Sequence, residues 1–138
     1  MADIVKRIEY YYTVVPDRPG GGAKLLDALK AARVNLLAVN GFPRDAGHAQ
    51  LDFVPSNQRD FRAAARKAGL KLVGPKTAFL VQGQDRVGAV AAIASKLARA
   101  HINITALQAV SGGRRRYGAI FWVKTRNVGR AAEVLGAA

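Results

Sequence analysis

Cysteine is absent from this chain of 138 residues, and histidine occurs only twice, at His48 and His101. Without thiols the chain has no disulfide, no thiolate zinc site and no cysteine nucleophile, and two distant histidines do not suggest a metal centre. The first residues carry charges where a signal peptide would be apolar, and no run approaches ~18 apolar residues. We therefore expect a cytoplasmic protein without a membrane span, a metal or another cofactor.

Acidic residues are also scarce, with 9 Asp and Glu against 22 Lys and Arg, which gives a net charge of +13. An excess of this size favours an anionic partner such as nucleic acid. The basic residues are shared almost equally by the two halves of the chain, which favours general solubility or weak non-specific attraction over one nucleic-acid-reading surface. Hydrophobic residues make up 50% of the chain, enough for a packed core.

The strongest positive feature is an internal repeat. The segment Asp17-Arg18-Pro19-Gly20 recurs as Asp85-Arg86-Val87-Gly88, at an offset of 68 positions. Without a gap, the same offset aligns further pairs as far as residue 64, among them Leu29 with Leu97, Asn35 with Asn103 and Phe53 with Phe121. One offset over this length indicates a duplication, and hence two copies of one structural unit.

Both copies contain the same succession of expected elements. Aromatic and β-branched runs at 10–15 and 78–82 predict strands, and an amphipathic helix follows each of them, with Pro19 suited to a first helical turn. A hairpin and a short helix come next in each copy. In the first copy, Lys71-Leu72-Val73 is expected to be a last short strand that Gly74-Pro75 stops. The expected hairpin strands are 36–39 with 49–54, and 104–110 with 117–123.

The order β-α-β-β-α-β is that of a ferredoxin-like fold. The expected fold class is therefore α+β, with two such repeats, antiparallel sheets and both helices of a repeat on one face. The expected boundaries are 8–76 for the first repeat and 77–138 for the second.

The N-terminal segment is expected to complete the second repeat. The last strand of that repeat would fall beyond Ala138, whereas subtracting the offset from 71–74 leads to 3–6, which is apolar in the right places. We therefore assign strand 3–7 to the second repeat and expect residues 3–15 to form one long strand, or nearly so. The two repeats would then be interlocked, and neither should fold alone.

A strand, the Asp-Arg-Pro-Gly turn, an amphipathic helix and then Val34-Asn35-Leu36 or Ile102-Asn103-Ile104 together resemble the ACT domain family. The likeness covers both repeats. ACT domains are small regulatory modules that pair side by side and bind amino acids or similar ligands at the interface. The resemblance implies a pseudo-dimer of the two repeats with up to two related sites between them. The implied ligand-binding residues are Asp17, Arg18, Gly20, Gly21, Asn35 and Leu36 in the first repeat, and Asp85, Arg86, Gly88, Asn103 and Ile104 in the second.

These residue types suit a small zwitterionic ligand. Glycines at a helix start expose backbone N–H groups at the positive end of the helix dipole, which favours a carboxylate. Asn35 and Asn103 each offer donors and an acceptor, and Asp17 or Asp85 could hold an ammonium group. For the aspartates we favour the simpler interpretation as N-caps, whereas for the asparagines a role as C-terminal turn residues is equally supported. The two repeats also differ, since Val87 replaces Pro19 and His101 replaces Arg33, so both sites need not bind.

The main alternative is a basic ferredoxin-like nucleic-acid-binding protein. The segment 115–122 (Arg-Arg-Tyr-Gly-Ala-Ile-Phe-Trp) matches several positions of the third strand of RNA-recognition motifs. Arg116 stands where that motif has glycine and Ala119 where it has a second stacking aromatic, which removes ~1–3 kcal/mol per base. The equivalent segment of the first repeat shows no trace of the pattern. Arg114-Arg115-Arg116 is interpreted as a solvated hairpin turn in preference to a phosphate contact.

No catalytic residues are expected, because no spacing suggests a set of nucleophile, base and carboxylate. The strand 118–123 is apolar on both faces, although a sheet with helices on one side should alternate. We therefore expect a second sheet to cover the free face in a homodimer. The sequence thus predicts a non-enzymatic, small-ligand-binding regulatory protein, with an amino acid as the first candidate ligand.

Overall fold

The computed structural model describes residues 3–138, which form six strands, four α-helices and one short 3-10 helix at Thr125–Asn127. Within this part of the chain, no helix is long and apolar enough to cross a membrane. In chain order the elements are β1 (Ile4–Pro16), α1 (Ala23–Ala31), β2 (Leu36–Asp45), β3 (His48–Pro55), α2 (Gln58–Lys67), β4 (Val73–Gln84), α3 (Ala89–Arg99), β5 (Ile104–Gly113), β6 (Arg116–Val123) and α4 (Val128–Leu135).

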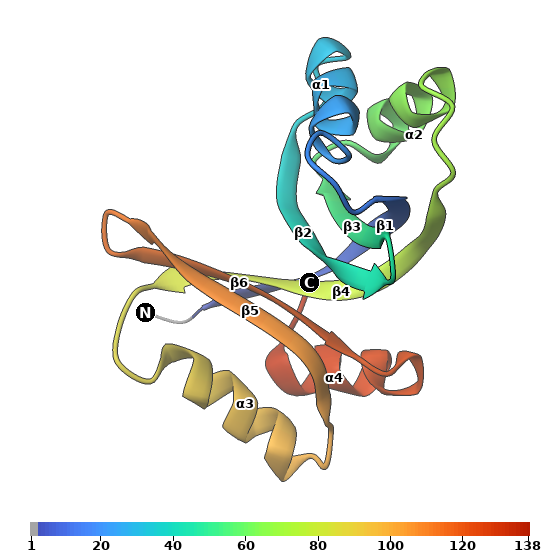
Figure 1. The fold of residues 1–138 in the computed structure, drawn as a ribbon. Helices are drawn as coiled ribbons and strands as arrows, with labels where there is room; N and C mark the ends of the chain where they lie inside the picture. Colours follow the sequence, from blue (N-terminus) through green and yellow to red (C-terminus); the bar gives the residue numbers. More distant parts are fainter. Residues whose placement is uncertain (1–2) are drawn as a thin grey trace. The chain divides into compact units, whose positions relative to one another are not determined.

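The chain divides into two compact units. One unit spans Glu9–Lys76, and the other joins the residues up to Ile8 with Thr77–Ala138. Hydrogen bonding sets the strand order β2-β3-β1-β4-β6-β5, and β2–β3, β3–β1, β4–β6 and β6–β5 are antiparallel pairs. Within each unit both helices lie on the same side of the strands (Figure 1). The predicted α+β class with two βαββαβ repeats is therefore confirmed.

The duplication is visible in the irregularities of the two hairpins. The β2–β3 ladder changes register between Leu36 and Ala38 and again between Pro43 and Asp45. The β5–β6 ladder does so between Ile104 and Ala106 and between Ser111 and Gly113, the same positions at the same offset. Because a bulge depends on local backbone geometry, its recurrence at equivalent residues indicates that the two units fold alike in detail.

Each unit has its own core between helices and strands. In the unit 9–76 one cluster of buried residues consists of Tyr11, Leu25, Leu29, Phe53 and Phe61, with the rings of Tyr11 and Phe61 5.2 Å apart. In the other unit the rings of Phe79 and Phe121 stack at 5.0 Å, and Ile93 and Leu97 of α3 pack beside them. Phe79 and Phe121 are the counterparts of Tyr11 and Phe53 at the repeat offset, so the duplicated positions form the centre of each core.

The N-terminal strand completes the second repeat, as predicted. Val5 is buried in the core that contains Phe79 and Phe121. The N–H of Arg7 donates to the carbonyl of Ala138 at 3.0 Å, and the N–H of Ala138 donates to the carbonyl of Val5 at 3.2 Å. Residues from both ends of the chain therefore lie side by side, and β1 is the single long strand expected.

Two local expectations are wrong. Gly74-Pro75 does not stop a strand, because β4 runs through both residues from Val73 to Gln84. A β-carbon at Gly74 would lie only 2.9 Å from the carbonyl oxygen of Tyr10, so the glycine allows β1 and β4 to approach closely. Pro19 is not in a first helical turn, since α1 begins at Ala23 and Pro19 lies in the preceding turn.

Both faces of β6 are already buried within one chain. Phe121 is fully buried on the helix-covered face, and Ile120 and Trp122, which alternate with it, are each only 8% exposed. A second copy is therefore not needed to cover Ile120 and Trp122. A homodimer stays a prediction that needs other support.

Candidate functional site

The loop between β4 and α3 lines a surface hollow and contains three of the predicted site residues, Asp85, Arg86 and Gly88. The other walls come from the first turn of α3, the end of β5 and the start of β6, and consist of Ala89, Val90, Ala91, Ala109, Val110, Ser111 and Tyr117. The hollow therefore combines an apolar helix start with a few polar groups, a composition typical of small-ligand sites.

No side chain caps the start of α3. The helix begins at Ala89 after Gly88, whose φ of +84° lies in the left-handed region that favours glycine. The N-cap position is Gly88 and not Asp85, whose own N–H donates to the carbonyl of Arg115 at 2.8 Å. The N-cap interpretation of Asp85 is therefore wrong. The first turn of α3 and its positive dipole end lie at the hollow without a side-chain acceptor, an environment that favours an acceptor or an anion.

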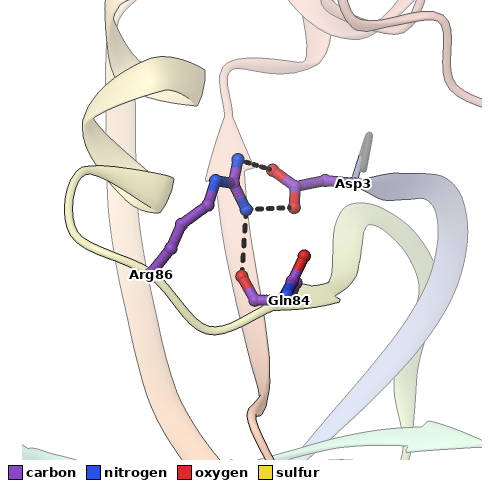
Figure 2. Close-up of polar contacts among 3 residues, drawn as sticks. All are labelled: Asp3, Gln84 and Arg86. Atoms are coloured by element: carbon purple, nitrogen blue, oxygen red, sulfur yellow. Dashed lines mark hydrogen bonds and ion pairs between the residues drawn. The ribbon is translucent and has the colours of Figure 1, made fainter.

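Arg86 is held by an acidic residue from the other end of the sequence. Its Nη1 and Nη2 donate to Oδ1 and Oδ2 of Asp3 at 3.0 and 3.2 Å, and Nη1 also donates to the carbonyl of Gln84 at 3.0 Å (Figure 2). The Asp3 side chain is 10% exposed and that of Arg86 is 38% exposed. Asp3 thus makes a bidentate ion pair with Arg86, a residue of the candidate site.

This ion pair shifts the titration of the groups around it. The hydrogen bond from Arg86 lowers the pKa of Asp3 below its usual value, against the opposing effect of burial, and the same contact raises the pKa of Arg86. Burial, and then the nearby Asp3 carboxylate, raise the pKa of Tyr117 to about 12. The Tyr117 hydroxyl is buried, and among the described residues it has no hydrogen-bond partner of standard geometry. It is therefore neutral at ordinary pH and lies beside the ion pair.

Sequence reasoning missed Asp3 and Tyr117 as members of this site. The repeat offset and the apolar residues of segment 3–6 predict that it completes the second repeat, but they give no role to the Asp3 side chain. The signal that could have found Asp3 is its position, because Asp3 directly precedes β1, which lies beside β4, and the Asp-Arg turn directly follows β4. The sequence places Tyr117 in the hairpin strand 117–123 and in the segment that matches an RNA-recognition motif, and neither points to this site. Neither proximity follows from the spacing of residues along one repeat.

The equivalent loop of the first repeat, 17–22, is held mainly by its own backbone. The N–H of Asp17 donates to the carbonyl of Gly47, and the N–H of Gly21 donates to the carbonyl of Arg18, both at 3.0 Å. A β-carbon at Gly21 would overlap the carbonyl oxygen of Pro16, so the turn itself requires glycine there. Helix α1 follows Gly22 without a side-chain cap, and Asp17 is therefore not an N-cap either.

Asn35 and Leu36 line a different hollow of the first unit. Its other residues belong to α1 and the turn after it, namely Leu26, Leu29, Lys30, Arg33 and Val34. The carbonyl of Asn35 accepts hydrogen bonds from the N–H and Oγ of Ser56, at 3.0 and 3.1 Å, and the residue is exposed. Asp17, Arg18, Gly20 and Gly21 do not line this hollow.

Asn35 and Asn103 are not the residues that end the preceding helices. The left-handed positions after α1 and α3 are Arg33 and His101, each with φ of 59°. The N–H of Val34 donates to the carbonyl of Leu29, and that of Ile102 to Leu97, which closes both helices with the same turn. The interpretation of the asparagines as C-terminal turn residues is therefore wrong. Asn103 is exposed and Ile104 half-buried at the start of β5.

The structure argues against β6 as an RNA-binding strand. Tyr117 would have to face solvent to stack on a base, but it is 6% exposed and belongs to the core that contains Phe121. Since Ala119 already lacks an aromatic ring, neither stacking position is available. Arg114 and Arg115 form the exposed β5–β6 turn, with φ values of 54° and 60°, as the hairpin interpretation required. Between residues 3 and 138 no cluster of His, Asp or Glu could hold a metal ion.

Comparison with known families identifies the second half of the chain. The model of the ACT domain family matches residues 77–138. The second repeat is an ACT domain. This confirms the predicted resemblance for the repeat that contains the hollow, and the first repeat shares its order of elements at the same offset. No curated protein matches the chain in sequence.

Solved structures show the same fold for almost the whole chain. The protein BT0572 from Bacteroides thetaiotaomicron superposes with a TM-score of 0.80 at 14% identity, covering 97% of this chain and 88% of that one. The ligand-free regulatory subunit of aspartate kinase from Thermus thermophilus superposes with a TM-score of 0.67 at 14% identity, covering 99% and 95%. The corresponding subunit from Thermus flavus gives 0.60 at 15% identity, covering 99% and 95%. At these identities the likeness establishes a shared fold.

Proposed function

We propose that this protein is a non-enzymatic regulatory module that binds a small molecule, in the first place an amino acid. The observation that carries the proposal is the hollow at the start of α3 in the ACT domain, where Asp85, Arg86 and Gly88 meet an uncapped helix. The fold shared with regulatory subunits of aspartate kinase supports it. The location of a ligand between the two repeats, which the family resemblance implies, stays a prediction.

The chemistry of the hollow suits an amino acid. The uncapped first turn of α3 offers N–H groups and a positive dipole end to a carboxylate. Asp85 is exposed and provides the acceptor that an ammonium group needs. Val90 and Val110 add apolar surface for a side chain. The arrangement contains binding groups of both signs and no pairing of a nucleophile with a base, which is why we propose recognition without catalysis.

A thermal-shift screen of the twenty amino acids tests the proposal. A ligand at ~100 times its Kd adds ~2.7 kcal/mol of stability. For a chain of this length that is a rise in Tm of roughly 10 °C. Failure of every amino acid to raise Tm, together with salt-dependent binding of oligonucleotides, would favour the nucleic-acid alternative instead.

A pair of matched variants locates the binding. Ala91→Leu places a larger side chain in the hollow, whereas Ala92→Leu changes an exposed neighbour that does not line it. Both keep the helix, since leucine is a good helix former. We expect Ala91→Leu to abolish the ligand-induced rise in Tm and Ala92→Leu to preserve it. Equal effects of the two variants would place the ligand elsewhere.

We also propose that the protein associates into a homodimer. In a single chain the strands β2 and β5 are at the two ends of the strand order and carry exposed apolar side chains. Leu37 is 50% exposed, Val39 46% and Val110 71%. Edge strands of this kind tend to pair with another chain unless something covers them. Light scattering that shows a strict monomer at micromolar concentration would contradict the homodimer.

A further inference from the structure

The two repeats differ most where the site arginine lies. Arg86 in the second repeat is paired with Asp3, whereas no ion pair is recorded for its counterpart Arg18 among residues 3–138. At the repeat offset, Lys71 stands in the place of Asp3 and Ala49 in that of Tyr117. The first repeat therefore has a basic residue where the second has its carboxylate, and the pairing of Arg86 is specific to the second repeat.

We propose that Asp3 is a built-in competitor for Arg86, which weakens carboxylate binding at the hollow beside α3 until Asp3 leaves the arginine. This inference rests on the proposed function. Asp3 presents a carboxylate, the same group that an amino-acid ligand would present. It already makes the bidentate contact for which the guanidinium of Arg86 is suited.

The remaining donors of Arg86 do not restore a strong carboxylate site. Asp3 and the carbonyl of Gln84 take three of its five N–H groups, which leaves Nε–H and one N–H of Nη2 (Figure 2). A ligand carboxylate on this edge would meet a guanidinium whose charge is already compensated, and the Asp3 carboxylate would repel it. Whether the ligand replaces Asp3 or binds next to it, the charge of Asp3 opposes it.

The position of Asp3 allows it to leave without unfolding the unit. Asp3 comes directly before β1, which begins at Ile4. The strand β1 itself is anchored by the buried side chain of Val5 and by its backbone hydrogen bonds to Ala138. The Asp3 side chain can therefore rotate away while the strand stays paired. The Tyr117 hydroxyl, buried beside the ion pair and lining the same hollow, is a ready donor for an oxygen that enters.

The first test compares two variants that remove one negative charge each. Asp3→Asn removes the competitor, and Asp45→Asn removes an exposed carboxylate of equal charge that pairs with His48 at 2.7 Å. The probe is sodium acetate, titrated against the Nε–Hε signal of Arg86 in ¹⁵N NMR, with sodium chloride as the salt reference. We expect Asp3→Asn to lower the acetate midpoint about two- to fivefold, the range of an exposed ion pair. Asp45→Asn should leave it unchanged.

A second variant displaces Asp3 without changing its charge. A β-carbon at Gly83 would overlap Oδ1 of Asp3 and would also lie 2.9 Å from Cε1 of Tyr117, whereas one at Gly118, in the adjacent strand, would make only an ordinary contact with the carbonyl oxygen of Val81. We expect Gly83→Ala to lower the acetate midpoint as Asp3→Asn does, and Gly118→Ala to leave it unchanged. If Asp3→Asn fails to fold, this pair decides the question. An unchanged midpoint in the folded Asp3→Asn or Gly83→Ala protein, or an equal shift in either control, overturns the proposal.

The amino-acid screen separates the two proposals. If an amino acid binds wild type and Asp3→Asn with the same Kd, the proposed function stands and the role of Asp3 falls. If no amino acid binds either protein while the acetate midpoint still falls in Asp3→Asn, the competitor role stands and the proposed ligand class falls. Tighter amino-acid binding by Asp3→Asn, again about two- to fivefold, supports both.

Discussion

The two long strands β1 and β4 predict that the two units of this chain unfold together. The division between the units falls inside both strands, so the unfolding of one unit removes part of the strands of the other. Leu29 and Leu97 occupy equivalent positions in α1 and α3 and are 1% and 0% exposed. Truncation of either to alanine is expected to cost about 3–5 kcal/mol, from lost burial and the cavity that remains. This is a large share of the stability of an ordinary domain.

The single tryptophan of the chain makes the test specific, because Trp122 lies in β6 of the second unit. In urea, with a slope of about 2 kcal/mol per molar, each substitution should lower the unfolding midpoint by roughly 1.5–2.5 M. If unfolding is shared, Leu29→Ala in the first unit lowers the midpoint of Trp122 fluorescence as much as Leu97→Ala does. Far-UV circular dichroism should then give the same midpoint as fluorescence.

Leu26→Ala is the control variant for this unfolding test. Leu26→Ala lies on the same helix as Leu29, but its side chain is 37% exposed, so the midpoint should fall by less than half as much. Shared unfolding is refuted if Leu29→Ala leaves the fluorescence midpoint at its wild-type value while circular dichroism shows a separate, earlier transition. The units would then be independent despite their continuous strands.

Three further predictions concern single positions. Gly21→Ala should destabilise the protein by about 1–3 kcal/mol because its β-carbon overlaps the carbonyl of Pro16, whereas Gly22→Ala, with Leu51 at 3.4 Å, should change the unfolding midpoint little. Asn57→Ala should lower the stability by about 1 kcal/mol, because the Asn57 side chain caps α2 by accepting a hydrogen bond from the N–H of Asp60 at 2.9 Å. Urea unfolding measures this loss, and Arg59→Ala, at an exposed position of the same helix, is the control. Burial raises the pKa of Tyr117 from 10.0 in the unfolded protein to about 12 in the folded protein. The contribution of the protonated Tyr117 to stability is therefore fully present below about pH 10 and is lost as pH rises from about 10 to 12. Between pH 9 and pH 12, Tyr117→Phe should therefore lose about 3 kcal/mol less stability than the wild type. Urea unfolding at pH 9, 10.5 and 12 measures the difference, and equal pH profiles of the two proteins would contradict the raised pKa of Tyr117.

Much of the fold was predictable because it depends on local pattern and repetition. Apolar residues at helical or strand spacing, repeated at one offset, are enough to place the elements and to pair Leu29 with Leu97 and Phe53 with Phe121. The assignment of the N-terminal strand also followed from the repeat offset together with the apolar pattern of residues 3–6. The expectation at Gly74-Pro75 failed for a physical reason. A glycine and a proline break isolated strands, but here the absent side chain of Gly74 lets β1 approach.

The candidate site was predictable only in part. The Asp-Arg turn of each repeat was visible in the sequence, and the structure places Asp85, Arg86 and Gly88 around one hollow. The sequence alone determined that the chain is a duplicated α+β protein with equivalent turns before equivalent helices. Only the tertiary structure decided that those turns are not equivalent in charge. Asp3 reaches Arg86 across 83 positions of sequence because β1 runs beside β4, and in the first repeat no residue plays that part.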